Sequence, residues 1–213
     1  MELFPVYLNL YQRACLVVGG GSVASRKITH LLRCGARVTV VAPEAEAEIE
    51  QLARDGEIRW EPRGFEESDL EAMFLVFSAT DEEGLNHRIS TLCQERNIPI
   101  NVVDDPRHCS FFVPAVVRRG SLALAISTAG KSPMYARRLK EELQEIVTPE
   151  HGEFVEMLGE VREEVKRAFP EEIDKRREIF KSLVYSDILE LLLAGEKDEA
   201  KERIKACISS LPD

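Results

Sequence analysis

Residues 14–34, ACLVVGGGSVASRKITHLLRC, contain the pattern that decides the fold of the N-terminal half of the chain. The apolar run 14–18 leads into three glycines, after which apolar residues recur at helical spacing from Val23 to Leu32. A strand, a glycine turn and a helix in this order predict the first part of a parallel α/β sheet.

The same alternation of apolar runs and amphipathic segments continues to residue 103. Strands are predicted at 14–18, 36–42, 58–60, 74–79 and 98–103, and helices at 22–34, 44–55, 67–73 and 81–97. Strands that alternate with longer helices predict a right-handed, doubly wound parallel sheet of the Rossmann type, and therefore an α/β fold.

The pattern changes after residue 105. Two β-rich runs, 111–117 and 121–127, are joined by an Arg-Arg-Gly turn and predict an antiparallel hairpin. Its strand edges need cover, and pairing with a second copy would supply it, so we expect a homodimer. Ser132 and Pro133 suit the N-cap and the first position of a following helix.

From about residue 148 the chain is helical and acidic, with breaks expected at 169–170, 185–186 and 195. The chain is thus divided into three regions. Their expected bounds are 1–113, 114–147 and 148–213.

Composition places the chain among globular proteins. It has 213 residues, of which 44% are hydrophobic and 31% are charged. No apolar run approaches the ~20 residues of a membrane span and no leader pattern is present, so we expect a cytoplasmic protein without membrane contact. Five cysteines without a CxxC pair indicate reduced thiols, and four histidines without HxxxH or HExxH spacing predict surface or capping roles.

Charge is segregated along the chain. The net charge of −10 argues against a general nucleic-acid binder, yet residues 106–140 contain no acidic residue. The bases of this basic segment are Arg107, Arg118, Arg119, Lys131, Arg137, Arg138 and Lys140. It is either a cradle for a polyanionic ligand or a solvated helix face that pairs with the acidic C-terminal third.

Within the basic segment, residues 127–133 (STAGKSP) superficially suggest a phosphate loop. Position 125 is Ala where a Walker A motif requires its first glycine, so we reject that motif. The hydroxyls of Ser127 and Thr128, with Lys131 before a helix N-terminus, still suit contact with a carboxylate or a phosphate.

Residues 19–24 fit the GxGxxA pattern of dinucleotide-binding turns. Gly19 permits the tight turn, Gly21 lets the backbone approach a pyrophosphate, and Ala24 allows close helix packing. An acidic residue for the ribose is expected ~20 residues later, where the chain reads Val-Ala-Pro-Glu up to Glu44. Glu44 either bonds the ribose or begins the next helix, and the lack of an adjacent Arg favours NAD over NADP.

Asp104 and Asp105 follow the last predicted strand, at the carboxyl edge of the sheet where ligands of open α/β sheets bind. A carboxylate there can act as a general base beside a nicotinamide or as a metal ligand. The alternative is an Asx turn before Pro106. Asn101 lies in an apolar strand, so its amide needs a hydrogen-bond partner.

Several of these residues, taken together, resemble the precorrin-2 dehydrogenase family, which is the dehydrogenase/ferrochelatase portion of siroheme synthase. The resemblance covers nearly the whole chain, which looks like the stand-alone form without a methyltransferase domain. It rests on Phe4-Pro5 and Leu8; Val17 to Gly21, Val23-Ala24 and Arg26-Lys27; Ala79 to Asp81 and Asn86; Asn101 to Asp104; Phe111 and Pro114; and Ser127 to Gly130, Ser132-Pro133 and Ala136-Arg137.

The resemblance implies NAD-dependent oxidation of precorrin-2 to sirohydrochlorin in a homodimer, with Fe²⁺ insertion to give siroheme as a second activity of some members. The fold it implies is an NAD-binding Rossmann domain at 1–113, a dimerisation region of hairpin and helix at 114–147, and a small C-terminal helical domain at 148–213. It assigns catalysis, and a metal contact, to Asp104, but no role to Asp105. The NAD contacts it implies are Gly19, Gly20, Gly21, Ser22, Val23, Pro43 and Glu44. The substrate carries several carboxylates, which would explain the positive charge of the basic segment. The residues expected to contact the substrate are Arg118, Arg119, Ser127, Thr128, Lys131, Arg137 and Arg138.

Alternatives stay open. The first is a non-catalytic dinucleotide-sensing module, which would need no polyanion site after Asp105. The second is a dehydrogenase that leaves metal insertion to another enzyme, because Asp104 is compatible with both activities. His108 also lies close enough in sequence to serve as the base in place of Asp104.

Overall fold

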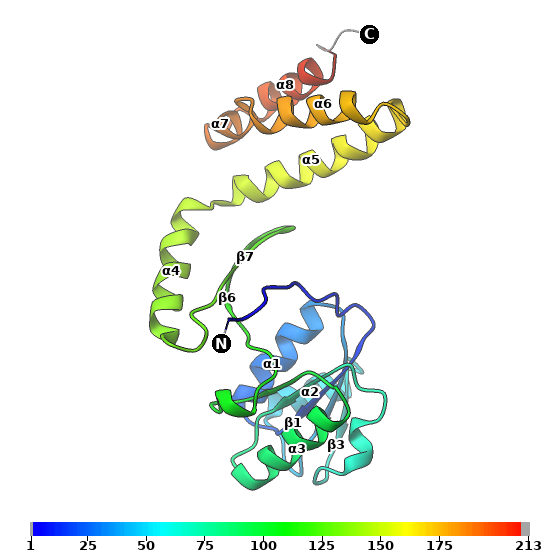
Figure 1. The fold of residues 1–213 in the computed structure, drawn as a ribbon, viewed down its shortest axis with the longest axis vertical. Helices are drawn as coiled ribbons and strands as arrows, with labels where there is room; N and C mark the ends of the chain where they lie inside the picture. The colour runs from blue at the N-terminus through cyan, green and yellow to red at the C-terminus, as the bar shows by residue number, and fades with distance from the viewer. Residues whose placement is uncertain (1, 210–213) are drawn as a thin grey trace. The chain divides into compact units, whose positions relative to one another are not determined.

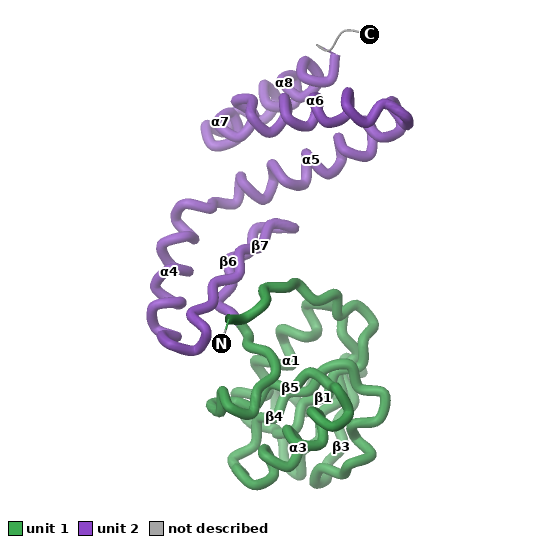
Figure 2. The backbone as a smooth tube through the Cα atoms, in the orientation of Figure 1, with its two compact units in different colours: residues 1–113 green, residues 114–213 purple. Residues whose placement is uncertain are grey.

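A computed structural model describes residues 2–209 and divides the chain into two compact units, 1–113 and 114–213 (Figure 2). The elements of the first unit are β1 (Ala14–Val18), α1 (Ser22–Arg33), β2 (Arg37–Val41), α2 (Ala47–Arg54), β3 (Ile58–Glu61), the 3-10 helix η1 (Glu67–Leu70), β4 (Leu75–Ser78), α3 (Glu83–Glu95), β5 (Ile100–Val102) and the 3-10 helix η2 (Pro106–His108).

The strands of the first unit form one parallel sheet in the order β3-β2-β1-β4-β5. The order reverses between β1 and β4, which is where a doubly wound sheet opens its ligand-binding crevice. Figure 1 shows the helices of this unit around the sheet. The predicted Rossmann-type α/β fold is confirmed.

Alternate residues of β1 face opposite sides of this sheet. Cys15 and Val17 pack with α1 and α2 in one core, whereas Leu16 and Val18 pack with α3 and η1 in the other. Both faces are therefore covered, which explains why the strands read as continuous apolar runs. All five cysteines are free in this structure.

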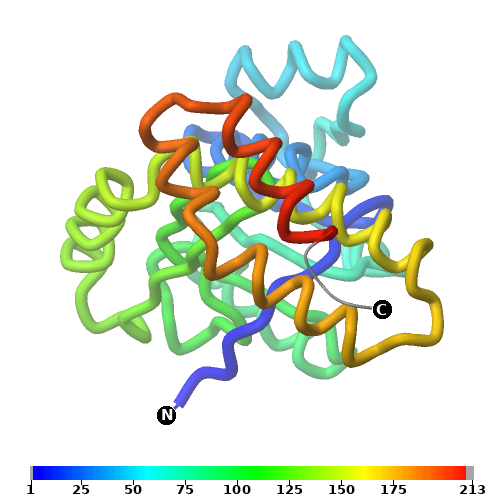
Figure 3. The backbone as a smooth tube through the Cα atoms, turned by 90° about the horizontal axis from the view of Figure 1, so that it is seen from above, coloured from blue at the N-terminus to red at the C-terminus, as the bar shows by residue number. Residues whose placement is uncertain are grey.

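The second unit contains a hairpin and helices. Its elements are β6 (Ala115–Arg119), β7 (Leu122–Ile126), α4 (Pro133–Ile146), α5 (Pro149–Ala168), α6 (Ile173–Val184), α7 (Ile188–Leu193) and α8 (Lys197–Ser209). A separate apolar core joins α5 to α8, which run from yellow to red in Figure 3. The Ser132 hydroxyl accepts the Tyr135 N–H at 3.3 Å and caps α4 as predicted.

Helix α5 packs closely on the hairpin. A Cβ atom at Gly152 would lie 2.6 Å from the Arg119 carbonyl oxygen, so this approach requires glycine. The Ser121 N–H donates to Glu156 Oε1 at 2.8 Å and ties the turn to the same helix. The predicted helix breaks coincide with the ends of α5, α6 and α7.

Three predicted boundaries are wrong. The segment expected as a helix at 67–73 is the short 3-10 helix η1, in which Glu66 and Asp69 form a capping box. Helix α2 begins at Ala47 and not at residue 44, because the preceding loop is held by the glycine turn. The hairpin begins at Ala115 and not at 111, because Phe111 packs edge-on against Phe77 in the first unit.

Among the described residues, no helix combines the length and the apolar character that crossing a membrane would require.

Candidate active site

The glycine turn between β1 and α1 is shaped by two close approaches. Gly19 has φ +120°, and a Cβ atom there would collide with the Ala79 carbonyl oxygen at the end of β4. A Cβ atom at Gly20 would collide with the Glu44 carbonyl oxygen. These two glycines therefore hold the turn against the neighbouring strand ends.

Gly21 differs from the two glycines before it, because a Cβ atom there would meet nothing within 4 Å. Gly21 is the N-cap of α1, and the first turn of this helix has neither a side-chain cap hydrogen bond nor an acidic residue. Open space over uncapped N–H groups fits an anionic pyrophosphate, while Ala24 is fully buried against the sheet as predicted.

The loop after β2 lies beside this turn. The Glu46 N–H donates to the Gly20 carbonyl at 2.9 Å, and Pro43 and Glu44 are exposed. Because α2 begins only at Ala47, Glu44 belongs to the loop and does not begin the helix. Its carboxylate is therefore available at the place where a dinucleotide ribose is expected.

Asp104 and Asp105 follow β5 but have different surroundings. Asp104 has φ +59° and is exposed, and its carboxylate accepts no hydrogen bond within residues 2–209. Asp105 makes the turn instead, since its Oδ1 accepts the Arg107 N–H at 3.2 Å and caps η2. The Asx-turn alternative thus applies to Asp105 and leaves the Asp104 carboxylate free.

Lys27, which belongs to the resemblance but has no role assigned by it, is a charged neighbour of Asp104. It is half-buried on α1, with its Nζ 5.4 Å from the centroid of the Phe77 ring. Burial lowers the pKa of Lys27, although the charge of Asp104 favours the protonated form. Lys27 therefore places a second charged group near the edge from which Asp104 projects.

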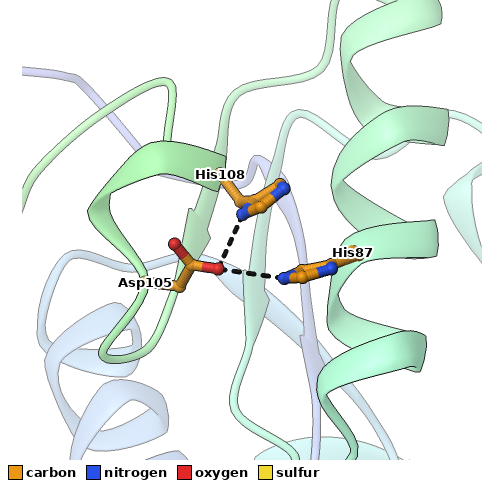
Figure 4. Close-up of side chains that lie close together, drawn as sticks. All are labelled: His87, Asp105 and His108. Carbon is orange, nitrogen blue, oxygen red and sulfur yellow. Dashed lines mark hydrogen bonds and ion pairs between the residues drawn. The ribbon is translucent and has the colours of Figure 1, made fainter.

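A second cluster adjoins Asp104. Figure 4 shows His87 from α3 and His108 from η2 directed at one oxygen of Asp105. Asp105 Oδ2 lies 2.6 Å from His108 Nδ1 and 3.1 Å from His87 Nε2. Burial raises the pKa of Asp105, but the hydrogen bonds from His108 and His87 prevail and hold it below its usual value.

His87 and His108 are partly exposed, which agrees with the predicted surface or capping roles, but the prediction did not include their meeting at Asp105. His87 and His108 are far apart in sequence, so no local spacing pattern could reveal them. His87 lies in the helix after β4 and His108 in the 3-10 helix after β5. Because these strands are neighbours, their carboxyl ends lie at the same edge of the sheet, and this shared edge could have indicated that the two histidines meet. His87, Asp104 and Asp105 line a cleft of about 310 Å³.

Buried amides support the ends of β4 and β5. Asn86 accepts hydrogen bonds from the Ser78 and Thr80 hydroxyls at 2.7 and 2.8 Å. The amide of Asn101 donates to the Phe111 carbonyl at 3.0 Å, so the partner expected for it is present. These contacts fix the edge from which Asp104 projects.

The predicted substrate residues all lie in the second unit. In the turn before α4, the Ser127 hydroxyl accepts the Ala129 N–H at 3.2 Å and the Thr128 hydroxyl accepts the Ser132 N–H at 3.1 Å. Both hydroxyls therefore order the turn, and Lys131 is exposed on it.

Three arginines of the basic segment have partners within the second unit. Arg119 donates to the carbonyls of Val147 and Gln144 at 2.8 and 2.9 Å and so caps the C-terminus of α4. Arg137 pairs with Glu141 at 3.0 Å and Arg138 with Glu142 at 2.7 Å. Arg118 is exposed on β6. The solvated-face interpretation thus describes Arg137 and Arg138 as they stand in the free protein.

Comparison with known proteins identifies the regions of the chain. Residues 6–115 match the family described as "Putative NAD(P)-binding", residues 119–146 match "Sirohaem biosynthesis protein central" and residues 150–208 match "Sirohaem synthase dimerisation region". The chain belongs to the sirohaem biosynthesis family of NAD(P)-binding proteins. The dimerisation match falls on the α5–α8 region, whereas the sequence analysis assigned dimerisation to 114–147.

Individual relatives of this family agree. The chain is 40% identical over 210 residues to a siroheme synthase of Thioalkalivibrio sulfidiphilus, covering 99% of this chain and 43% of the relative. A siroheme synthase of Pseudomonas entomophila is 36% identical, with 100% of this chain and 46% of the relative covered. The chain thus spans less than half the length of these curated relatives.

A solved structure matches over nearly its full length. The protein described as SirC, precorrin-2 dehydrogenase, is 28% identical, with a TM-score of 0.76 over 95% of this chain and 99% of that one. The chain therefore has a precorrin-2 dehydrogenase-like fold with an NAD(P)-binding domain.

Proposed function

We propose that this chain oxidises precorrin-2 to sirohydrochlorin with NAD as the hydride acceptor. The observation that carries the proposal is the free, exposed carboxylate of Asp104 at the carboxyl edge of the sheet, beside a glycine turn that fits a dinucleotide. The name of the solved relative, precorrin-2 dehydrogenase, and the siroheme synthase relatives support the same substrate.

The dinucleotide is held by the glycine turn, with the N–H groups of Ser22 and Val23 at the start of α1 facing its pyrophosphate and Glu44 facing its ribose. When bound, the nicotinamide supplies the acceptor for a hydride. Oxidation of the macrocycle also releases a proton, and Asp104 accepts it as the general base.

The basic segment is proposed to bind the carboxylates of the tetrapyrrole. Arg118 and Lys131 are exposed and supply charge without rearrangement. Arg137 and Arg138 are proposed to exchange their exposed partners, Glu141 and Glu142, for substrate carboxylates, since such surface pairs contribute only ~0.2–1 kcal/mol. Ser127 and Thr128 would add polar contacts, and Arg119 would support the site by holding α4.

Insertion of Fe²⁺ into the product, with the ion as a substrate, is a second candidate reaction. It is favoured by a specific observation, because Asp104 adjoins the cluster of His87, Asp105 and His108. In this reaction Asp104 would accept a pyrrole proton as the metal enters. A dehydrogenase without this second activity remains the alternative.

An anaerobic assay separates these functions. The protein is incubated with precorrin-2 and NAD, and Fe²⁺ or Co²⁺ is added after the first spectral change. We expect one change that requires NAD and a second that requires the metal. A single change identifies a dehydrogenase alone, and NAD binding without any change identifies a dinucleotide-sensing module.

Two further properties belong to this proposal. The exposed Glu44, without an adjacent arginine, favours NAD, so turnover with NADP at an equal rate would contradict the cofactor choice. A homodimer is proposed from the open edges of the β6–β7 hairpin and from the dimerisation region matched at 150–208. A monomeric mass by light scattering at micromolar concentration would contradict it.

A further inference from the structure

We propose that His87, Asp105 and His108 bind one divalent first-row transition-metal ion, such as Co²⁺, Zn²⁺ or Fe²⁺. They offer two imidazole nitrogens and one carboxylate oxygen, and these atoms all lie within 4.8 Å of one another. Two histidines and one carboxylate form the donor set of many zinc and non-haem iron sites, whereas Mg²⁺ and Ca²⁺ prefer oxygen ligands alone.

The ligand atoms already converge on one point (Figure 4). The His87 and His108 rings are stacked, with centroids 3.9 Å apart and planes at 21°. Each directs one nitrogen at Asp105 Oδ2, at 3.1 and 2.6 Å. Ligands ~2.1 Å from one metal lie only ~3 Å apart, so small side-chain rotations would let an ion replace the shared protons.

The backbone around the three side chains is fixed. The hydroxyl of Ser90, which is fully buried on α3, donates to the His108 carbonyl at 2.8 Å and ties η2 to α3. Asp105 Oδ1 is occupied by the Arg107 N–H, which leaves Oδ2 for both imidazoles. The two histidines are therefore held in place before any ion binds.

The cluster is open on one side. The side chains of His87, Asp105 and His108 are 38%, 22% and 33% exposed, so water or a substrate could occupy the remaining metal positions. The Glu83 carboxylate, one helical turn before His87, lies 3.8 Å from its Nε2 and could supply a fourth ligand. Asp104 is the next residue along the edge of the same cleft.

The role of the bound ion as the metal substrate rests on the proposed function, whereas its binding does not. Beside Asp104, the cluster would hold the metal substrate close to the base that receives the pyrrole proton. Binding itself requires neither the tetrapyrrole nor NAD, so it is tested without them.

The test is an anaerobic titration of the full-length apo protein with Co²⁺ alone, followed by calorimetry and by the visible absorption of bound cobalt. We expect one ion per chain, displaced by Zn²⁺ and not by excess Mg²⁺. His87→Gln and His108→Gln should each weaken binding about 10–100-fold, while His151→Gln, which alters a capping residue of the second unit, should not.

Asp105→Asn keeps an oxygen for the Arg107 N–H and removes the charged ligand, so it tests the site without deleting the turn. NAD binding and thermal unfolding of each variant show whether it folds. Absence of cobalt binding in the wild-type protein, or binding that survives both histidine substitutions, would overturn the proposal. In that case the histidines only brace the turn, and the dehydrogenase assay is unaffected.

Discussion

The two units treat their predicted site residues differently. In the first unit the glycine turn, Glu44 and Asp104 keep their backbone N–H groups or carboxylates available. In the second unit Arg119 caps α4, and Arg137 and Arg138 pair with glutamates one turn away. Motifs defined by backbone geometry therefore led to accessible groups, whereas the count of charges selected accessible groups, Arg118 and Lys131, together with arginines that already have partners.

The reason lies in the helix period. The acid-free segment ends at residue 140, yet Glu141 and Glu142 follow at once. Positions i and i+4 share one face of a helix, so these acids lie beside Arg137 and Arg138 although they fall outside the segment. The segment's positive charge is thus partly balanced in the free protein, and substrate binding has to compete with these pairs.

The largest expected effect is at Asp104. Asp104→Ala should lower kcat for precorrin-2 oxidation about 10²–10⁴-fold, because the step loses its general base. NAD affinity, measured by fluorescence, should stay unchanged, since the carboxylate is exposed. Tm should fall only slightly, because Ala adopts the left-handed backbone of Asp104 less readily than Asp, and Asp104→Asn controls for this effect. His108→Ala, measured alongside Asp104→Asn, decides between the two candidate bases. The assignment to Asp104 is wrong if only the histidine variant loses turnover.

The glycine turn offers a matched pair of substitutions. Gly21→Ala adds a methyl group in open space, so the protein should fold normally, but the methyl occupies the approach of the pyrophosphate. We expect the Kd for NAD to rise about 10-fold or more with no change in Tm. Gly20→Ala collides with the Glu44 carbonyl and should lower both affinity and Tm. Equal loss of Tm in the two variants would contradict this division.

Local patterns predicted most of the fold, because they depend on neighbouring residues. The bounds of β1 and the breaks of the C-terminal helices follow from apolar runs and from glycine or proline. Contacts that depend on tertiary structure were not predictable. Phe111 reads as hairpin but packs on Phe77, and His87 meets His108 only because β4 and β5 are adjacent.

The arginines and lysine of the basic segment should give smaller effects. Reversing the charge at Arg118, Lys131, Arg137 or Arg138 should raise KM for precorrin-2 about 2–5-fold and weaken its salt dependence, without changing NAD affinity. Arg119→Ala should instead lower Tm, because the last carbonyls of α4 lose their donor. An unchanged KM in all four charge-reversal variants would mean that the basic segment is only a solvated helix face.

The smallest expected effect is on Tm, and it comes from removing the charge of an acidic residue that pairs with an arginine. One such acidic residue is compared in each unit. Asp69 accepts two hydrogen bonds from Arg63, at 2.9 and 2.6 Å, and the Glu66 N–H at 2.8 Å. The bond from Arg63 is the main reason that the pKa of Asp69 lies below its usual value. Glu142 is half exposed and pairs with Arg138 on the surface of α4.

Asp69→Asn should therefore lower Tm by a few degrees at neutral pH, while Glu142→Gln changes it little. Because folding depresses the pKa of Asp69, its contribution is complete above the unfolded value of ~3.9 and is lost as the pH falls through the lower folded value. The gap in Tm between wild type and Asp69→Asn should stay constant from pH ~7 to ~5 and close below pH ~4. A gap that does not narrow as the pH falls below ~4 would mean that Asp69 acts through packing and not through its charge.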